Sequence, residues 1–316
     1  MMISQFQAGE TVVGYFLIKS ATFKSTNNNN RFLDINIADK SGEINAKVWD
    51  ITDEIEKIFM DKSIAVIKIQ GTVTEWQGKL QLKIDKVRPL SADDDININD
   101  LVPTAPYEPV LMLNKIKQYI SAIENQDIRS IVNYIFEASE ERLLYYPAAK
   151  SNHHSIHAGL LYHIMTMLRS GESLSAIYTH LNRDLLYAGI ILHDIAKIDE
   201  MDANELGVVA DYTIEGNLLG HIIQGIKKVE QAVEAVGADE EIAIVLQHMI
   251  LSHHQRPEFG SPKAPMIPEA ELLHYIDMID SRMYDMHKAI TDVEPSNFSD
   301  KVWSLENRRI YKPAIK

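Results

Sequence analysis

The spacing of apolar residues changes once along the chain, and this change constrains the fold more than any other feature. Residues 11–90 alternate apolar and polar side chains in short runs between turn residues, as in "RFLDINIADKSGEINAKVWD". This period of two is typical of β-strands. From residue 110 onward apolar residues recur every three or four positions, as in "LLYAGIILHDIAKI", which predicts helices. We therefore expect an α+β protein with a β-domain followed by an all-helical domain.

The first segment has the turns and the strand order of a small barrel. The stretches "DKSG" and "WQGK" predict hairpin turns, and "NNNN" at 27–30 predicts a flexible hairpin tip. Residues 52–60, "TDEIEKIFM", predict one short helix between the third and fourth strands. Five strands with a helix at that point are the order of an OB-fold barrel. We place this domain at residues 1–90.

An acidic run followed by prolines separates the two patterns. The stretch "SADDDININDLVPTAPYEP", residues 91–109, continues neither period and is typical of a linker. The helical domain then occupies residues 110–316.

Composition limits the chemistry and the compartment. The 316 residues include no cysteine, which excludes disulfides and thiolate metal sites and suits a reducing compartment. Any metal must therefore be held by His, Asp or Glu. The apolar run "TVVGYFLI" near the start is short and has no basic leader, so it predicts neither a signal peptide nor a membrane span. We expect a cytoplasmic protein without a membrane partner.

The charge is negative but uneven. The net charge is −14, yet residues 1–90 hold 12 Lys and Arg against 11 Asp and Glu, so the acid lies in the second part. A strongly acidic chain disfavours a nucleic-acid partner. Bound metal ions can nevertheless supply positive charge locally, so the net charge does not exclude a nucleic-acid partner.

Histidines and aspartates are concentrated in the helical part. Several lie inside strongly apolar stretches, where an unpaired imidazole is costly. A single histidine in an apolar stretch can be explained by a hydrogen bond to the backbone in the core. Several histidines and aspartates spread over five predicted helices indicate a metal site instead. Imidazole with carboxylate favours Mn²⁺, Fe²⁺, Co²⁺ or Zn²⁺, and so many ligands suit two ions. The predicted ligands are His163, His193, Asp194, His221, His253, His254 and Asp277.

The order of these residues resembles a known signature. His163, "HD" at 193–194 and Asp277 resemble the H…HD…D pattern of the HD-domain metal-dependent phosphohydrolases, with Asp277 rather than Asp280 as its last member. His221 in "GHIIQG" and the pair His253–His254 resemble the extra ligands of two-metal members. With an OB-like domain ahead of it, the chain closely resembles the bacterial YhaM-type 3′→5′ exoribonucleases over nearly its whole length.

The resemblance implies a mechanism. The expected activity is metal-dependent release of 5′-nucleotides from the 3′ end of single-stranded RNA, and also of single-stranded DNA. Two divalent ions, Mn²⁺ first among them, would polarise the scissile phosphate and lower the pKa of the attacking water. Asp194 would bridge the ions as a catalytic residue.

Basic and aromatic residues complete the predicted contacts with the substrate. Lys197 lies one turn after His193 on the same helix face, and we predict that it and Arg282 hold phosphate oxygens, with a catalytic role for Lys197 as well. "NHHSIHAG" contains His153, His154 and His157, which we predict to be surface residues at a helix start, with the lining of the substrate entry as the alternative.

The barrel offers side chains that stack on bases or follow a phosphate backbone. These are Phe23, Lys24, Arg31, Trp49, Trp76 and Lys79. Because the barrel is only modestly basic, a homo-oligomer with several barrels would raise the affinity for single strands.

Two other functions stay open on the sequence. A small-nucleotide phosphohydrolase of the HD type accounts for the buried ligands but leaves the barrel without a role. A non-catalytic protein that binds single-stranded DNA accounts for the barrel but leaves the buried polar residues without one.

Overall fold

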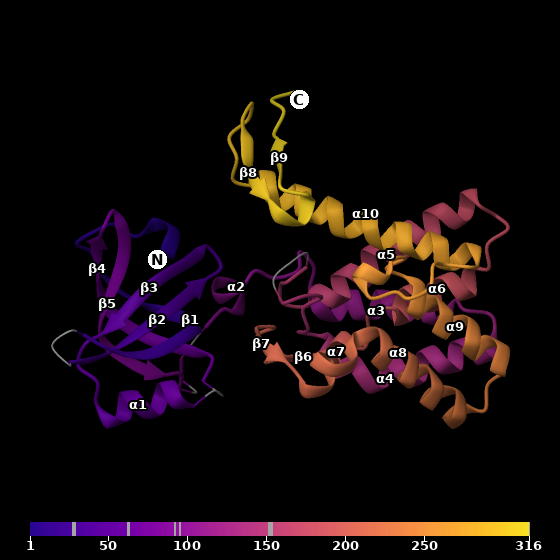
Figure 1. Cartoon of the computed structure of the whole chain (residues 1–316), viewed down its shortest axis with the longest axis horizontal. Helices are drawn as coiled ribbons and strands as arrows, with labels where there is room; N and C mark the ends of the chain where they lie inside the picture. Colours follow the sequence, from indigo (N-terminus) through magenta and orange to yellow (C-terminus); the bar gives the residue numbers. More distant parts are fainter. Residues whose placement is uncertain (27–29, 62–63, 92, 95, 151–153, 316) are drawn as a thin grey trace. The chain divides into compact units, whose positions relative to one another are not determined.

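The chain forms two compact units, Met1–Pro103 and Thr104–Lys316 (Figure 1). The computed structural model describes residues 1–26, 30–61, 64–91, 93–94, 96–150 and 154–315. The hairpin tip predicted at 27–30 therefore lies outside the described residues except for Asn30. Each unit is described by itself.

The first unit is a closed barrel with strand order β1-β2-β3-β5-β4. Neighbouring strands are antiparallel except for β3 and β5, which pair in parallel. One helix, α1 (Asp53–Met60), follows the third strand and precedes the fourth. This order confirms the predicted OB-fold. The strands are β1 (Thr11–Ser25), β2 (Arg31–Asp39), β3 (Gly42–Val48), β4 (Val66–Trp76) and β5 (Lys79–Pro89).

Alternating side chains fill the barrel. Leu33, Ile35 and Ile37 of β2 are fully buried, and each such side chain contributes about 1.5–3 kcal/mol. Helix α1 begins where the Thr52 side chain accepts a hydrogen bond from the Ile55 amide, which satisfies one of the free N–H groups of the first turn. Ile58 of α1 joins the same core. The hydrophobic core of the barrel is therefore built from aliphatic and aromatic side chains, and the buried carboxylate of Asp39 accepts a hydrogen bond from the Ile3 amide.

The beginning of the predicted linker is held by the barrel. The Asp94 carboxylate accepts hydrogen bonds from Arg88 at 2.6 and 2.7 Å and from the Tyr15 hydroxyl at 2.8 Å. Farther along, Lys40 donates to Asp100 at 2.7 Å, within the short helix α2 (Ile98–Leu101). These contacts tie one residue of the acidic run and one residue after it to the barrel.

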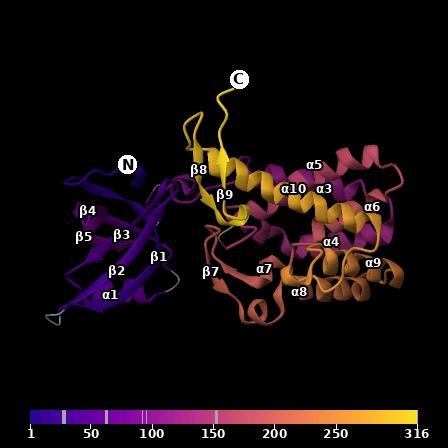
Figure 2. The same cartoon turned by 45° about the horizontal axis from the view of Figure 1, so that its top comes forward.

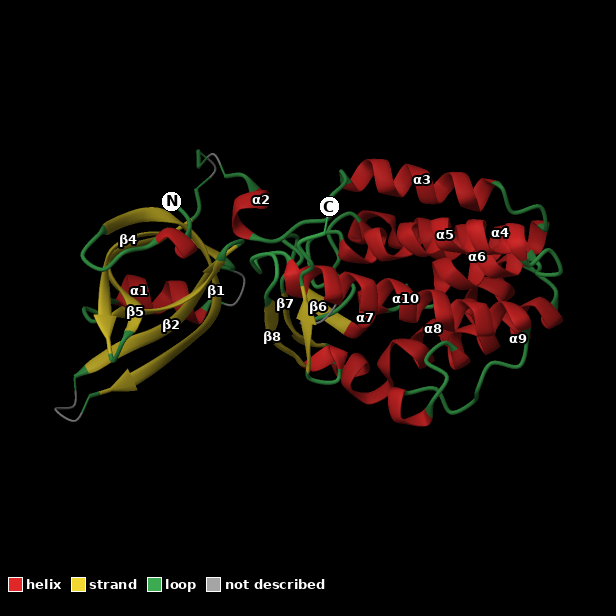
Figure 3. Cartoon of the chain, turned by 90° about the horizontal axis from the view of Figure 1, so that it is seen from above, coloured by secondary structure: helices red, strands yellow, loops and turns green. Residues whose placement is uncertain are grey.

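The second unit is built on helices around one large core. Helix α3 packs on α4 and on α5, and Figure 3 shows it along one side of the helical unit. Helix α10 packs on α5, α6 and α9, so the buried faces of several helices meet in the interior. The helices are α3 (Pro109–Ser121), α4 (Gln126–Leu143), α5 (Gly159–Ile177), α6 (Arg183–Leu192), α7 (Lys197–Glu200), α8 (Ile214–Val236), α9 (Glu240–Ser252) and α10 (Pro268–Ile290).

Two hairpins interrupt the helical unit, so the expectation of helices alone is wrong at these places. Strands β6 (Met201–Ala203) and β7 (Val209–Tyr212) form the first. Strands β8 (Phe298–Val302) and β9 (Arg308–Tyr311) form the second, at the C-terminal end of α10 (Figure 2). Strands of three to five residues are too short for a period of two to be recognised. In the described ranges, no helix combines the length and apolar character needed to cross a bilayer.

Candidate metal centre

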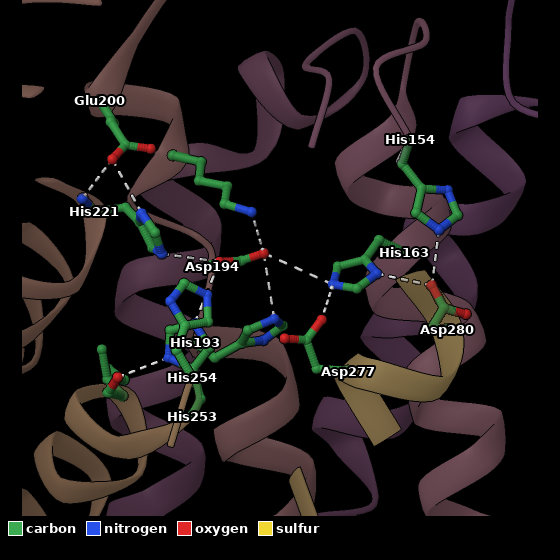
Figure 4. A network of polar contacts seen from close by, with 12 residues as sticks. His154, His163, His193, Asp194, Glu200, His221, His253, His254, Asp277 and Asp280 are labelled. Carbon is green, nitrogen blue, oxygen red and sulfur yellow. Dashed lines mark hydrogen bonds and ion pairs between the residues drawn. The ribbon is translucent and has the colours of Figure 1, made fainter. Parts of the chain in front are cut away.

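All seven predicted ligands come together in the interior of the helical unit (Figure 4). They are supplied by separate elements. His163 lies on α5, the pair His193–Asp194 directly follows α6, and Asp277 lies on α10. The others are His221 on α8 and the pair His253–His254 directly after α9. His163, His193 and His253 are fully buried, and Asp194 is 2% exposed, so water contributes little to their solvation.

Asp194 lies between two groups of histidines. Its Oδ2 atom is 3.4 Å from Nε2 of His193 and 3.7 Å from Nε2 of His163. Its Oδ1 atom is 3.3 Å from Nε2 of His221 and 3.8 Å from Nε2 of His253. The two oxygens of one carboxylate therefore face different imidazoles.

The ligand atoms form two compact groups on either side of Asp194. His163, His193 and Asp277 offer atoms that all lie within 4.8 Å of one another, and Asp277 Oδ1 is 3.3 Å from His163 Nε2. Atoms of His221, His253 and His254 meet the same limit. Each group has the size and the donor atoms of a site for one divalent cation.

Hydrogen bonds fix which nitrogen faces the centre. Nδ1 of His193 lies 2.8 Å from the Ile190 carbonyl, Nδ1 of His253 lies 2.7 Å from the Ile250 carbonyl, and Nδ1 of His254 lies 2.6 Å from the Phe259 carbonyl. A carbonyl oxygen only accepts, so these Nδ1 atoms carry the proton. Nε2 of each neutral ring then has a lone pair available for a metal.

Several atoms at the centre lack a hydrogen bond. Among the described residues, Nε2 of His193, His221 and His253 and Oδ1 of Asp194 are buried without such a partner. A buried polar atom left unsatisfied costs about 1–3 kcal/mol. Because these nitrogens belong to the two groups of ligand atoms and Asp194 Oδ1 faces His221 and His253, a cation in each group would satisfy them, and the residues present therefore fit divalent metal.

The electrostatics of the cluster favour a positive charge. Burial by itself lowers the pKa of His163, but the Asp277 and Asp280 carboxylates outweigh it and raise that pKa to about 10. Burial opposes the charge of Asp194 as well, yet the Lys197 ammonium holds the pKa of Asp194 well below its usual range. The carboxylates are thus ionised and create a field that attracts a cation.

The structure gives two predicted phosphate ligands other partners. Lys197 Nζ lies 2.6 Å from Asp194 Oδ2, so Lys197 is at the centre but contacts a ligand carboxylate. The Arg282 guanidinium makes two hydrogen bonds to Glu306, at 2.7 and 3.1 Å. The contact between Arg282 and phosphate stays a prediction, and a phosphate would have to compete with Glu306 for this guanidinium.

The prediction for His154 is wrong, because this residue is buried. It is 1% exposed, and its Nε2 lies 2.8 Å from Asp280 Oδ2. The same Asp280 oxygen lies 2.8 Å from Nδ1 of His163. His157 is half-buried, and His153 lies outside the described residues.

Sequence reasoning missed two carboxylates beside the ligands. Asp280 contacts His163, and Glu200 Oε1 lies 3.0 Å from Nδ1 of His221. The spacing of three between Asp277 and Asp280, which puts both on one helix face, was a usable signal. Glu200 gave no such signal, because its partner is 21 positions away.

The barrel carries the other predicted contact residues. Trp49 is 42% exposed and stacks on Phe32 with ring centroids 4.9 Å apart. Lys47 lies over both rings, at 5.4 and 5.9 Å from their centroids. Phe32 and Lys47 were not predicted. Trp76, 66% exposed, and Lys79 are at the two ends of the β4–β5 turn.

Two predicted cations of the barrel have acidic partners. Lys24 lies 2.5 Å from Asp34, and Arg31 lies 3.0 Å from Glu56. Arg31 also lies over the Phe23 ring at 5.4 Å. Both cations are therefore engaged within the barrel, and a phosphate would have to compete with a carboxylate for them.

Comparisons with known proteins agree with this arrangement. The family model of the HD domain matches residues 160–282. The chain is 44% identical to the 3′-5′ exoribonuclease YhaM of Shouchella clausii over 99% of its length and 97% of that protein. It is 41% identical to the 3′-5′ exoribonuclease YhaM of Bacillus subtilis over 98% of its length and 97% of that protein.

A solved structure resembles part of the chain. The mitochondrial single-stranded DNA-binding protein Rim1 of S. cerevisiae matches 27% of this chain and 97% of its own, with 17% identity and a TM-score of 0.21. A likeness this low carries no argument about function.

Proposed function

The chain belongs to the YhaM family of 3′-5′ exoribonucleases, and from this premise we propose that it removes 5′-nucleotides from the 3′ end of single-stranded RNA. It is a metal-dependent exonuclease hydrolase with a nucleic-acid substrate. The choice of RNA, with single-stranded DNA as a further substrate, is part of the proposal. A cytoplasmic location, where an RNA substrate is met, is part of it as well.

The observation that carries the proposal is the position of Asp194 between two groups of ligand atoms. Two divalent ions fit these groups, one beside His163, His193 and Asp277, and one beside His221, His253 and His254. Asp194, with one carboxylate oxygen facing each group, would help to hold both ions. We propose Mn²⁺ as the ion, because imidazole and carboxylate donors together suit it.

The chain's own residues prepare the centre for a phosphodiester. Bound ions supply Lewis acidity, which polarises the phosphate and lowers the pKa of an attacking water. The backbone carbonyls on three Nδ1 atoms hold the rings in one tautomer, so the ligand geometry is present before substrate arrives. Lys197 stays protonated, because the nearby Asp194 carboxylate raises its pKa against the effect of burial. Its ammonium, 2.6 Å from Asp194 Oδ2, would neutralise charge on a phosphate oxygen bound beside Asp194.

The barrel supplies the longer contact with the strand. The stacked rings of Phe32 and Trp49, with Lys47 above them, combine a stacking surface with a cation, as single-strand binding requires. They lie on β2 and directly after β3, the strands whose outer face binds oligonucleotides in OB-folds. Assembly into a homo-oligomer would multiply this contact.

The test is a time course on 5′-labelled single-stranded RNA with Mn²⁺, compared with the same reaction after metal removal by EDTA. We expect labelled products that shorten progressively, 5′-mononucleotides as the released species, and no reaction without metal. A 3′-duplexed strand of the same sequence is the control and should be degraded more slowly. Internal cuts from the first time point, or hydrolysis of free nucleotides without degradation of the strand, would contradict the proposal.

A further inference from the structure

Each of the two ligand groups contains one histidine whose Nδ1 faces a carboxylate. His163 faces Asp280 and His221 faces Glu200. The remaining three histidines, by contrast, direct Nδ1 to backbone carbonyls. Figure 4 shows the two carboxylates on opposite sides of Asp194. Each ligand group therefore has one carboxylate that faces the Nδ1 atom of one of its histidines.

We propose that Asp280 and Glu200 are positioning residues, each of which strengthens metal binding at one of the two ion positions through its histidine. The inference rests on the two-ion centre of the proposed function. A carboxylate that accepts the Nδ1 proton makes Nε2 a stronger donor to the metal and holds the ring in place. A backbone carbonyl also holds the ring in place, but it strengthens Nε2 as a donor less than a carboxylate does, because it carries no net charge.

The contact of Glu200 with His221 is built into the backbone. Gly220 interrupts α8 with φ of 68° and ψ of 166°, a conformation that favours glycine. The break leaves the His221 amide free of the helix, and this amide donates to Glu200 Oε1 at 2.9 Å. The same oxygen faces Nδ1 of His221 at 3.0 Å. One carboxylate oxygen thus fixes both the backbone and the ring of His221.

A second glycine lets the two elements approach. A Cβ atom on Gly216 would lie 2.0 Å from the Glu200 carbonyl oxygen, so any larger residue would force α8 away from Glu200. The amide of Thr213 also donates to that carbonyl at 3.0 Å. Glu200 is therefore held from the start of the same helix that carries His221.

Asp280 is held in a comparable way from the other side. Its Oδ2 atom lies 2.8 Å from Nδ1 of His163 and 2.8 Å from Nε2 of His154. The His154 ring in turn packs on Tyr284, with centroids 4.1 Å apart. The buried His154 thereby restricts where the Asp280 carboxylate can point, and Asp280 restricts His163.

The experiment measures binding of Mn²⁺ to metal-free protein by isothermal titration calorimetry. Glu200→Gln and Asp280→Asn remove the charge and keep the volume. In each variant we expect one of two ions to bind about 10–100-fold more weakly, while the other keeps its affinity. In a protein that already carries His221→Ala, the further change Glu200→Gln should not weaken Mn²⁺ binding any more, because Glu200 acts through His221.

Glu269→Gln is the matched control. Glu269 is also buried and also accepts a backbone amide, that of Asn182 at 2.7 Å, and its change should leave both ions unaffected. If both variants, Glu200→Gln and Asp280→Asn, bind two ions as tightly as the wild type, the inference is overturned. The proposed function is left intact by that result. A single ion in the wild type would contradict the two-ion centre itself.

Discussion

The barrel and the helical unit place polar groups in opposite parts of the fold. In the barrel, the core is apolar and the side chains suited to nucleic acid lie on the outside, several of them beside a partner of opposite charge. In the helical unit, ionisable side chains meet in the interior and depend on one another. The effects of substitutions on the barrel surface on strand binding should therefore add up, whereas the effects of substitutions at the centre on activity should not be additive.

The largest effect is expected from Asp194→Asn. This change weakens the carboxylate that faces both ligand groups, so a loss of transition-state stabilisation of several kcal/mol, about 10³-fold in rate, follows. Addition of Mn²⁺ should also stabilise the wild type against heat more than the variant. The measurements are the degradation rate of single-stranded RNA and the melting temperature with and without Mn²⁺.

A nearby acid provides the control. Asp199 pairs with Arg142 and Lys228 instead of the ligands, so Asp199→Asn should retain most activity. Strand binding, measured by fluorescence anisotropy, should survive in both variants, because the barrel is unchanged. Near-normal degradation of RNA by Asp194→Asn would show that the centre of the helical unit does not carry the activity, and the contrast between the two units would fail.

A smaller effect is expected from Trp49→Ala on the barrel. Stacking of one base on an aromatic ring is worth about 1–3 kcal/mol, so affinity for a long single strand should fall about 5- to 150-fold. The turnover of a very short oligonucleotide should change little. Trp303→Ala is the control, since Trp303 is equally aromatic and 75% exposed but lies in the second unit. Equal losses from both changes would argue against a stacking surface on β2 and β3.

The salt dependence of binding tests the ion pairs of the barrel. Three free cations would give a slope of log affinity against log salt of about −2, at −0.7 per phosphate contact. Because Lys24 and Arg31 are paired with acids, we expect a slope of about −1.4, from Lys47 and Lys79. Asp34→Asn releases Lys24 and should make the slope steeper. An unchanged slope in Asp34→Asn would show that Lys24 does not reach the strand.

The smallest effect is expected from Asp94→Asn. Hydrogen bonds from Arg88 and from the Ser91 amide lower the pKa of Asp94, so its ionised form stabilises the barrel. This contribution is complete above the ordinary aspartate pKa of about 4 and is lost as the pH falls toward the lowered value. Amide hydrogen exchange in β4 and β5 should be faster in the variant than in wild type at neutral pH. A difference that persists unchanged in strong acid, after the wild-type carboxylate has been protonated, would contradict the assignment to its ionised form.

The sequence by itself determined the two fold classes and the set of residues that the structure brings together as candidate metal ligands. A period of two or of three to four is a local property, and it was sufficient for the barrel, for α1 and for the long helices. The seven predicted ligands stood out because buried histidines and aspartates are rare in apolar helices, and their order resembles a family signature. Short strands such as β6 and β8 contain too few residues for any period.

Tertiary structure alone decided the partners of these residues. Asp280 meets His154 across 126 positions of the chain, and Glu200 meets His221 only where Gly220 breaks a helix. The same holds for Arg282, whose guanidinium pairs with Glu306. A hydrogen bond depends on distance and angle between atoms within about 3 Å, and such geometry arises only when distant segments pack. Residue type and spacing therefore identify the candidate metal ligands, while packing determines which nitrogen each histidine turns toward the centre and which charge lies beside it.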